Sequence, residues 1–252
     1  MAKGLIDVIV DSIFDEKWIG SRGEKLTERE LKLVNLFGRK GKTLRNLYVP
    51  KEDGKTSEID VIYITQKGIF VFESKNYSGW IFGDEDGLYW TVSLPNGQKN
   101  RFYNPIKQNR THLKWLGQFL GGEVPLFSIV VFSERCELKK INVTSPDIKV
   151  IKRDRTYATV REIWETVDNV LSDDQIEALY SKLKTLTNAD EAVKLAHIKD
   201  IEDMKTVRES EVNLCPRCGK PLVLRTARKG DHAGEQFYGC SGFPGCRYME
   251  KQ

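Results

Sequence analysis

Two runs of the chain, residues 58–65 and 69–75, are rich in β-branched and aromatic residues and flank the short segment 66–68. Both faces of each run are largely apolar, and Gly68 supplies the positive φ that a tight hairpin turn needs. Strands that are apolar on both faces are typical of the interior of a sheet that is covered on each side. The pattern therefore predicts two central antiparallel strands that turn at 66–68.

The rest of the periodicity predicts helices and further strands around this hairpin. Apolar residues at helical spacing predict one helix over 25–37 and another over 105–120, with Asn104 as its N-cap. Capping-box patterns at 159–162 and 172–175 predict the starts of two more helices. Strands are expected at 44–49, 80–82, 88–92, 126–132 and 148–151. This order predicts an α/β fold with a mixed β-sheet flanked by helices.

Charged residues enter the apolar hairpin at one end. The turn brings Asp60 near Glu73 and Lys75, and the last two share a strand face because they lie two residues apart. Two carboxylates at an apolar site repel each other unless a cation lies between them, and oxygen ligands suit Mg²⁺ or Mn²⁺. Lys75 would then orient or deprotonate a water molecule and offset charge on a phosphoryl oxygen. The pattern favours a metal-dependent phosphodiesterase, and a solvated Glu73–Lys75 ion pair is the alternative.

Two residues at or just before the predicted helices are further candidates. Glu24 precedes Leu31 by one heptad, so its carboxylate can point inward, or it only complements the helix dipole. Gln108 would orient water or phosphate near a metal, or it is an ordinary exposed amide. Four aromatic residues after the hairpin either stack on bases or, as is more common, pack a sheet face: Tyr77, Trp80, Tyr89 and Trp90.

Four of the five cysteines crowd into the last part of the chain. Cys215 and Cys218 form a Cys-x₂-Cys knuckle, and Cys240 and Cys246 form a wider Cys-x₅-Cys pair. Two such pairs supply the four thiolates of a closed tetrahedral Zn²⁺ site. A closed site has no position for water, so we expect the zinc to be structural and to fold a module that is too small for its own core. Cys136 is expected to be a bystander thiol.

Basic and aromatic residues alternate around these cysteines. Cations neutralise phosphates and aromatic rings stack on bases, so the mixture favours nucleic-acid binding. In the alternative, the rings pack the small module and the charges only solvate it. The candidate nucleic-acid-binding residues are Arg217, Arg225, Arg228, Lys229, Phe237, Tyr238, Phe243, Arg247 and Tyr248.

Composition sets the outer limits. The 252 residues can hold one sizeable core and a small appendage, and the net charge of +4 with a pI ≈ 8.7 permits a nucleic-acid partner. No run approaches the roughly 18 apolar residues of a membrane span, and Asp7 and Asp11 make the N-terminus a poor signal peptide. We expect a cytoplasmic protein with no membrane partner, built from an α/β domain at 1–187, a charged helical linker at 188–211 and a Cys₄ zinc ribbon at 212–252.

The motifs between residues 20 and 132 resemble the nuclease-related domain (NERD) family, a branch of the PD-(D/E)xK nuclease-like superfamily. The matching segments are 20–24 before a helix, 58–60 on a strand, 68–76 followed by Gly79, and Asn104-Pro105 with Gln108 on a helix. The resemblance implies a restriction-endonuclease-like core. It also implies that the active-site positions are Glu24, Asp60, Glu73, Lys75 and Gln108. Ser74 stands where the family often has a hydrophobic residue, a minor departure because the backbone carbonyl would bind the metal.

The last forty or so residues are similar to the zinc ribbons at the C-termini of type IA DNA topoisomerases. The similarity lies in the segments 215–219, 222–228, 237–241 and 244–248. It implies a DNA-binding module, often for single-stranded DNA. No other topoisomerase region is evident, so topoisomerase activity is not expected.

These observations predict a Mg²⁺-dependent deoxyribonuclease in which Asp60 and Glu73 hold the metal and Lys75 activates water. Glu24 and Gln108 would assist in placing metal, water or substrate, and the ribbon would bind DNA. The alternative is a non-catalytic DNA-binding or DNA-processing accessory protein that binds single-stranded DNA through its ribbon. An RNA-directed role is a third option. Endonucleolytic and exonucleolytic cutting stay open, as does the oligomeric state.

Overall fold

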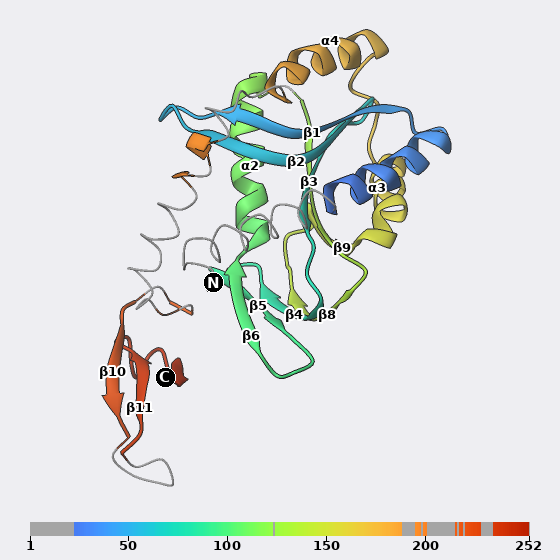
Figure 1. Cartoon of the computed structure of the whole chain (residues 1–252). Helices are drawn as coiled ribbons and strands as arrows, with labels where there is room; N and C mark the ends of the chain where they lie inside the picture. Colours follow the sequence, from blue (N-terminus) through green and yellow to red (C-terminus); the bar gives the residue numbers. More distant parts are fainter. Residues whose placement is uncertain are drawn as a thin grey trace, which may run out of the picture.

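The computed structural model describes residues 23–122, 124–187, 195–197, 199–200, 215, 217–218, 220–227 and 234–251 of the chain. A five-stranded mixed sheet forms its centre, in the order β1-β2-β3-β7-β9 (Figure 1). The strands are β1 (Gly41–Pro50), β2 (Thr56–Thr65), β3 (Gly68–Lys75), β7 (Leu126–Phe132) and β9 (Ile148–Lys152). The first three are antiparallel, whereas β3, β7 and β9 run parallel. The predicted mixed sheet and its central hairpin are confirmed.

Helices cover both faces of this sheet, which explains why its central strands are apolar on both sides. On one face, α2 (Pro105–Leu120) and α4 (Asp173–Lys184) pack against side chains such as Ile62, Ile64 and Val71. On the other face, the helix over residues 23–36 and α3 (Thr156–Thr166) share a core with side chains of β2, β3 and β7. The predicted flanking by helices is thus confirmed (Figure 1).

A second, four-stranded sheet lies beside the first, in the order β6-β5-β4-β8. It comprises β4 (Gly79–Asp84), β5 (Tyr89–Ser93), β6 (Lys99–Tyr103) and β8 (Cys136–Asn142). Its inner face packs onto the main sheet, where the Trp90 ring stacks on Phe132 with centroids 5.9 Å apart. Cys136 is buried in this core and its thiol donates to the carbonyl of Ser133. Two short 3₁₀ helices, η1 (Arg153–Arg155) and η2 (Thr185–Thr187), complete the domain.

Most predicted helix ends are confirmed. Asn104 caps α2 by accepting a hydrogen bond from the backbone N–H of Ile106, and Gly121 ends the helix in the left-handed conformation. Ser172 and Gln175 form the predicted capping box of α4. The prediction that residues 159–162 begin a helix is wrong. α3 begins at Thr156, directly after η1, so Thr159 lies inside the helix with its side chain buried.

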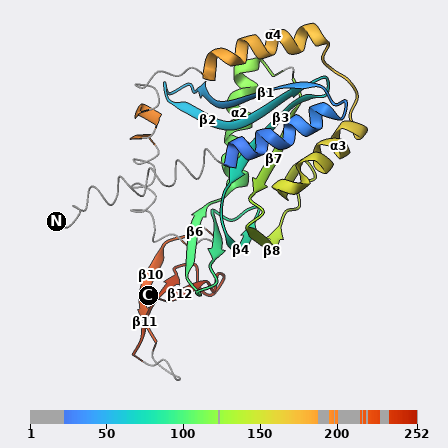
Figure 2. The ribbon, with the colours of Figure 1, turned by 45° about the vertical axis from the view of Figure 1, so that its right-hand side comes forward.

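The C-terminal part forms a small antiparallel sheet of β10 (Leu222–Thr226), β11 (Gln236–Cys240) and β12 (Met249–Lys251), which lies near β6 (Figures 1 and 2). Arg101 of β6 joins the two parts by donating to the Tyr248 hydroxyl and pairing with Glu250. Most of the predicted linker at 188–211 lies outside the described residues. Residues 195–197 and 199–200 are helical, and His197 contacts Thr56 and Glu58 of β2. None of the described helices is long and apolar enough to span a membrane.

Candidate functional site

Asp60, Glu73 and Lys75 meet at the end of the β2–β3 hairpin that lies away from the turn. The antiparallel register pairs Val61 with Phe72, so Asp60 and Glu73 stand opposite each other one step further on. The Asp60 carboxylate accepts a hydrogen bond from the backbone N–H of Ser74 at 2.7 Å. Glu73, whose side chain is 1% exposed, forms an ion pair with Lys75 at 2.7 Å. The structure therefore brings the three predicted hairpin residues together.

Helix α2 lays two side chains over this end of the hairpin. The amide oxygen of Gln108 accepts a hydrogen bond from Lys75 Nζ at 3.1 Å. One turn later, His112 Nε2 lies 3.0 Å from Glu73 Oε2, and His112 Nδ1 lies 2.7 Å from the hydroxyl of Ser57 on β2. Gln108 and His112 share a helix face because they are four residues apart. The strand pair and the helix thus hold Glu73 from both sides.

Sequence reasoning missed two members of this cluster, His112 and Ser57. A signal for His112 was present, because it lies one turn after Gln108 and therefore follows it onto the hairpin. Ser57 carried no such signal. It becomes recognisable only when the β2 register places it under the imidazole, where its side chain is buried.

Glu24 lies on the helix over residues 23–36, on the side of the sheet opposite to α2. The same helix touches the hairpin through Thr27, whose hydroxyl lies 3.2 Å from that of Ser74. Burial, followed by repulsion from Glu58, raises the pKa of Glu24 to about 7. Its Oε2 atom is buried and lacks a hydrogen-bond partner among the described residues. Of the two orientations considered for Glu24, the structure therefore shows the inward one.

The acids of the site differ in how their charge is compensated. Burial and the neighbouring charge of Glu73 raise the pKa of Asp60 well above its usual range. For Glu73, burial opposes ionisation, but the charges and hydrogen bonds of Lys75 and His112 outweigh it and lower the pKa. Burial also opposes the charge of Lys75, yet Glu73 and Asp60 raise its pKa to about 12. Glu73 and Lys75 are thus charged at neutral pH. Near Asp60 and Glu24, by contrast, the positive charge does not offset the burial and the repulsion that raise their pKa values.

This imbalance fits a divalent cation. Asp60 and Glu24 carry raised pKa values, and Glu24 has an unpartnered buried oxygen, as expected where negative charge lacks a counterion. Carboxylate oxygens are the ligands that Mg²⁺ and Mn²⁺ prefer. The ligand atoms are not already gathered, however. Among the described residues, only the four cysteines form a group of three or more candidate ligands within 4.8 Å of one another.

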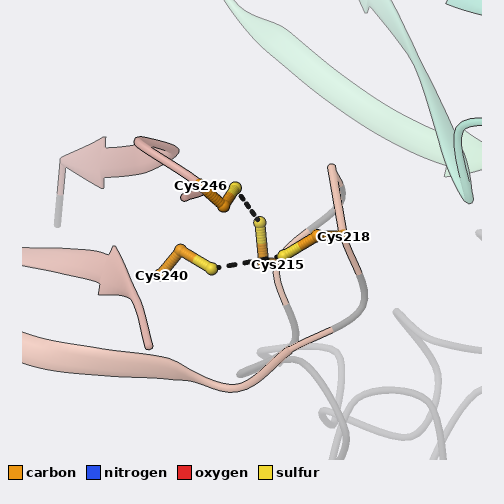
Figure 3. Close-up of side chains that lie close together, drawn as sticks. All are labelled: Cys215, Cys218, Cys240 and Cys246. Atoms are coloured by element: carbon orange, nitrogen blue, oxygen red, sulfur yellow. Dashed lines mark hydrogen bonds between the residues drawn. The ribbon is translucent and has the colours of Figure 1, made fainter. Parts of the chain in front are cut away.

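Cys215, Cys218, Cys240 and Cys246 point toward a common centre (Figure 3). The sulfur atoms of Cys215 and Cys246 lie 3.6 Å apart, and those of Cys218 and Cys240 lie 3.4 Å apart. All four sulfurs lie within 4.8 Å of one another, as four thiolates around one Zn²⁺ require. The small core of this module consists of three of the cysteines with Leu222, Tyr238 and Tyr248. The predicted structural zinc ribbon is supported.

The basic and aromatic residues of the ribbon divide between its surface and its core. Arg217, Arg225 and Arg247 are exposed, and the Arg225 guanidinium lies over the ring of Phe243, which is 58% exposed. The half-buried rings pack the module: Tyr238 and Tyr248 lie against the cysteine core, and Phe237 is half-buried on β11. Arg228 and Lys229 lie outside the described residues.

Two family descriptions match the chain. Residues 19–133 match the nuclease-related domain, and residues 212–252 match the topoisomerase DNA-binding C4 zinc finger. The first match contains the hairpin and α2, and the second contains all four clustered cysteines. The resemblances inferred from the sequence motifs are therefore confirmed. No solved structure matches the chain.

Similar proteins fall into two kinds. An uncharacterized protein of Bacillus anthracis is 33% identical over 184 residues, which cover 73% of this chain and 84% of that protein. DNA topoisomerase 1 of Mycoplasma genitalium is 28% identical over 79% of this chain but only 32% of its own length. DNA topoisomerase 1 of Mycoplasma pneumoniae is 41% identical over 25% of this chain and 8% of its own. The chain therefore spans a third or less of the two topoisomerases.

Proposed function

Because this chain belongs to the nuclease-related domain family, we propose that it is a metal-dependent DNA nuclease whose zinc ribbon binds DNA. The observation that carries the proposal is the convergence of Asp60, Glu73, Lys75 and Gln108 at one end of the central hairpin. An acid pair beside a lysine and an amide is suited to phosphodiester hydrolysis. The C4 zinc finger match supports DNA as the substrate.

Asp60 and Glu73 would hold the Mg²⁺ or Mn²⁺ ion, with Glu24 placing the ion or a water molecule. When bound, the ion would polarise the scissile phosphate and lower the pKa of a water molecule. Lys75 is held protonated by its acidic neighbours, so it is suited to stabilise negative charge on a phosphoryl oxygen rather than to accept a proton. Gln108 fixes the direction of the Lys75 ammonium through their hydrogen bond.

A second candidate function is a DNA-binding accessory protein that no longer cuts. One observation favours it: both Glu73 oxygens already have partners, Lys75 on one and His112 on the other. A carboxylate satisfied in this way can serve as a structural anchor. The zinc ribbon alone would then account for binding to DNA.

The two functions are separated by cleavage assays with zinc-loaded protein on supercoiled, linear and single-stranded DNA, with Mg²⁺ or Mn²⁺ added. The test variant is Glu73→Gln with Lys75→Ala. The matched control is Glu177→Gln with Lys42→Ala, because Glu177 of α4 and Lys42 of β1 form an ion pair at 2.6 Å with both side chains largely exposed. Cleavage that is kept in the control and lost in the test variant supports the nuclease. Equal cleavage by the test variant and the control would disprove the proposed active site. If the unsubstituted chain binds DNA but does not cleave it, the accessory protein is favoured.

A further inference from the structure

We propose that the outer face of the second sheet binds single-stranded DNA and continues the surface of the zinc ribbon. Here the outer face means the side of β4, β5, β6 and β8 that points away from the main sheet. This inference rests on the proposed DNA-directed function and adds a binding surface outside the hairpin site.

Strand register separates the two faces of the second sheet. Ile81, Trp90 and Val92 are buried and pack toward the main sheet. The alternate residues face outward, because side chains along a strand alternate between faces. Cross-strand pairing aligns Lys140, Phe82, Thr91 and Arg101 in one row and Glu137, Trp80, Ser93 and Lys99 in the next. The outer face therefore carries cationic residues at both edges and aromatic rings between them.

Exposure shows that packing does not account for the position of Trp80. The Trp80 side chain is 52% exposed, whereas Trp90 on the other face of the same sheet is 0% exposed. The Lys139 ammonium lies over the Trp80 ring, 5.3 Å from the ring centroid. Phe82 and Tyr89 are half-buried on the same face. An exposed tryptophan under a cation is a platform on which a base can stack.

Charge favours a polyanion as the occupant. A bulge between Ile81 and Phe82 shifts the pairing with β8, and the consecutive residues Lys139 and Lys140 are both exposed there. Lys99 and Arg101 supply positive charge on the opposite edge strand, β6. Glu137 is the acidic member of the second row, and Lys139 neutralises it at 2.7 Å. A phosphate backbone can thus be neutralised on either side of the rings.

The zinc ribbon adjoins the outer face at the β6 edge. Arg101 belongs to the outer face and donates to Tyr248 of the ribbon, while its guanidinium pairs with Glu250 at 3.3 Å. Figure 2 shows the ribbon strands next to β6. A strand of nucleic acid that leaves the ribbon can therefore pass directly onto the sheet. Single-stranded DNA is favoured over duplex DNA because only unpaired bases can leave their stack to lie on Trp80.

The test measures binding, separately from cleavage. The zinc-loaded full chain carries Glu73→Gln and receives no Mg²⁺, and a fluorescein-labelled single strand of about 20 thymidines reports binding by anisotropy. In this background we compare Trp80→Ala, Trp80→Phe and the double variant Lys139→Glu with Lys140→Glu. The control is Lys114→Glu, an exposed lysine of α2 that also lies over a tryptophan ring, that of Trp115.

We expect Trp80→Ala to weaken binding about tenfold and Trp80→Phe to restore most of it, because a phenyl ring still stacks. The double lysine variant should reduce the slope of log affinity against log salt by about 0.7 to 1.4, since each phosphate contact to a single strand contributes about 0.7 and Lys139 also pairs with Glu137. DNA should quench the fluorescence of the chain less in Trp80→Phe. A role of Trp80 in folding alone would not produce this quenching difference.

Three outcomes would overturn the inference. The first is that Trp80→Ala and the double lysine variant bind like Lys114→Glu. The second is that duplex DNA binds more tightly than the single strand, and the third is that RNA of equal sequence does. If binding depends on Trp80 as expected while the cleavage assay is negative, the surface stands and the nuclease proposal fails.

Discussion

His112 Nε2 lies 3.0 Å from Glu73 Oε2, and both side chains are buried, at 7% and 1% exposed. The other imidazole nitrogen is held by Ser57, so the ring has no freedom to turn away from the carboxylate. Glu73 is thereby fixed in one rotamer, with its second oxygen directed to Lys75. Supporting contacts of this kind orient the groups that bind a metal or substrate.

Replacing His112 by alanine tests this positioning role. Loss of the imidazole leaves one Glu73 oxygen without its partner, so we expect cleavage to fall about 10- to 100-fold and the Mg²⁺ requirement to rise. Cleavage rates across a Mg²⁺ titration measure both effects. Thr111→Ala is the control, since Thr111 is exposed and its hydroxyl donates to the Lys107 carbonyl of its own helix. An unchanged Mg²⁺ requirement in His112→Ala would contradict the positioning role.

Glu24→Gln tests the uncompensated charge. The raised pKa means that folded Glu24 binds its proton more tightly than the unfolded chain does, so ionisation costs stability. In metal-free protein this cost grows as pH rises from 4.5 to about 7 and stays constant above that. The variant lacks the cost, so its melting temperature should exceed that of the unsubstituted chain at about pH 8 and match it more closely at about pH 5.

The same Glu24 variant also reports on the cation. Mg²⁺ should raise the melting temperature of the unsubstituted chain at about pH 8 more than that of Glu24→Gln, because a cation that binds only the folded state stabilises it. Thermal unfolding with and without Mg²⁺ measures the difference. Equal shifts in the two proteins would show that Glu24 does not contribute to cation binding.

Gly68→Ala tests the turn that sets the hairpin register. Gly68 has φ +126°, and an added Cβ would lie 2.4 Å from the Pro125 carbonyl oxygen. We expect a loss of about 1–3 kcal/mol in unfolding free energy, measured by urea denaturation. Gly54→Ala is a matched control, because Gly54 also has a positive φ but has nothing within 4 Å of an added Cβ. A loss no larger than in Gly54→Ala would show that the contact with Pro125 is unimportant.

Removal of zinc should affect the ribbon and leave the α/β domain folded. Cys240→Ser deletes one of the four ligands, so we expect zinc content to fall from about one ion per chain to near zero. DNA binding should weaken in parallel. The five tryptophans all lie before residue 165, so the thermal transition followed by their fluorescence should be unchanged. Cys136→Ser is the control for zinc content, since Cys136 lies outside the cluster of four cysteines.

The sequence carried enough to predict the central hairpin, its end residues and the cysteine cluster, because each depends on local spacing. It was weaker where structure depends on distant partners. β6 and β8 were not predicted, since their polar residues show little apolar alternation and become strands by pairing with β5 and β4. The buried contact of Ser57 with His112 likewise joins residues 55 positions apart. The start of α3 was misplaced because η1 leads directly into it.

The order of assembly follows from the parallel pairing of β3 with β7. β2 and β3 are neighbours in the chain and can pair early. β3 can pair with β7 only later, because Ile69 pairs with Leu126 and the crossover through α2 lies between them. Gln108 and His112 lie within that crossover. The side chains of α2 can therefore cover Glu73 only after the hairpin has formed. During synthesis the acidic end of the hairpin should therefore stay exposed to solvent and inactive until more than fifty further residues have left the ribosome.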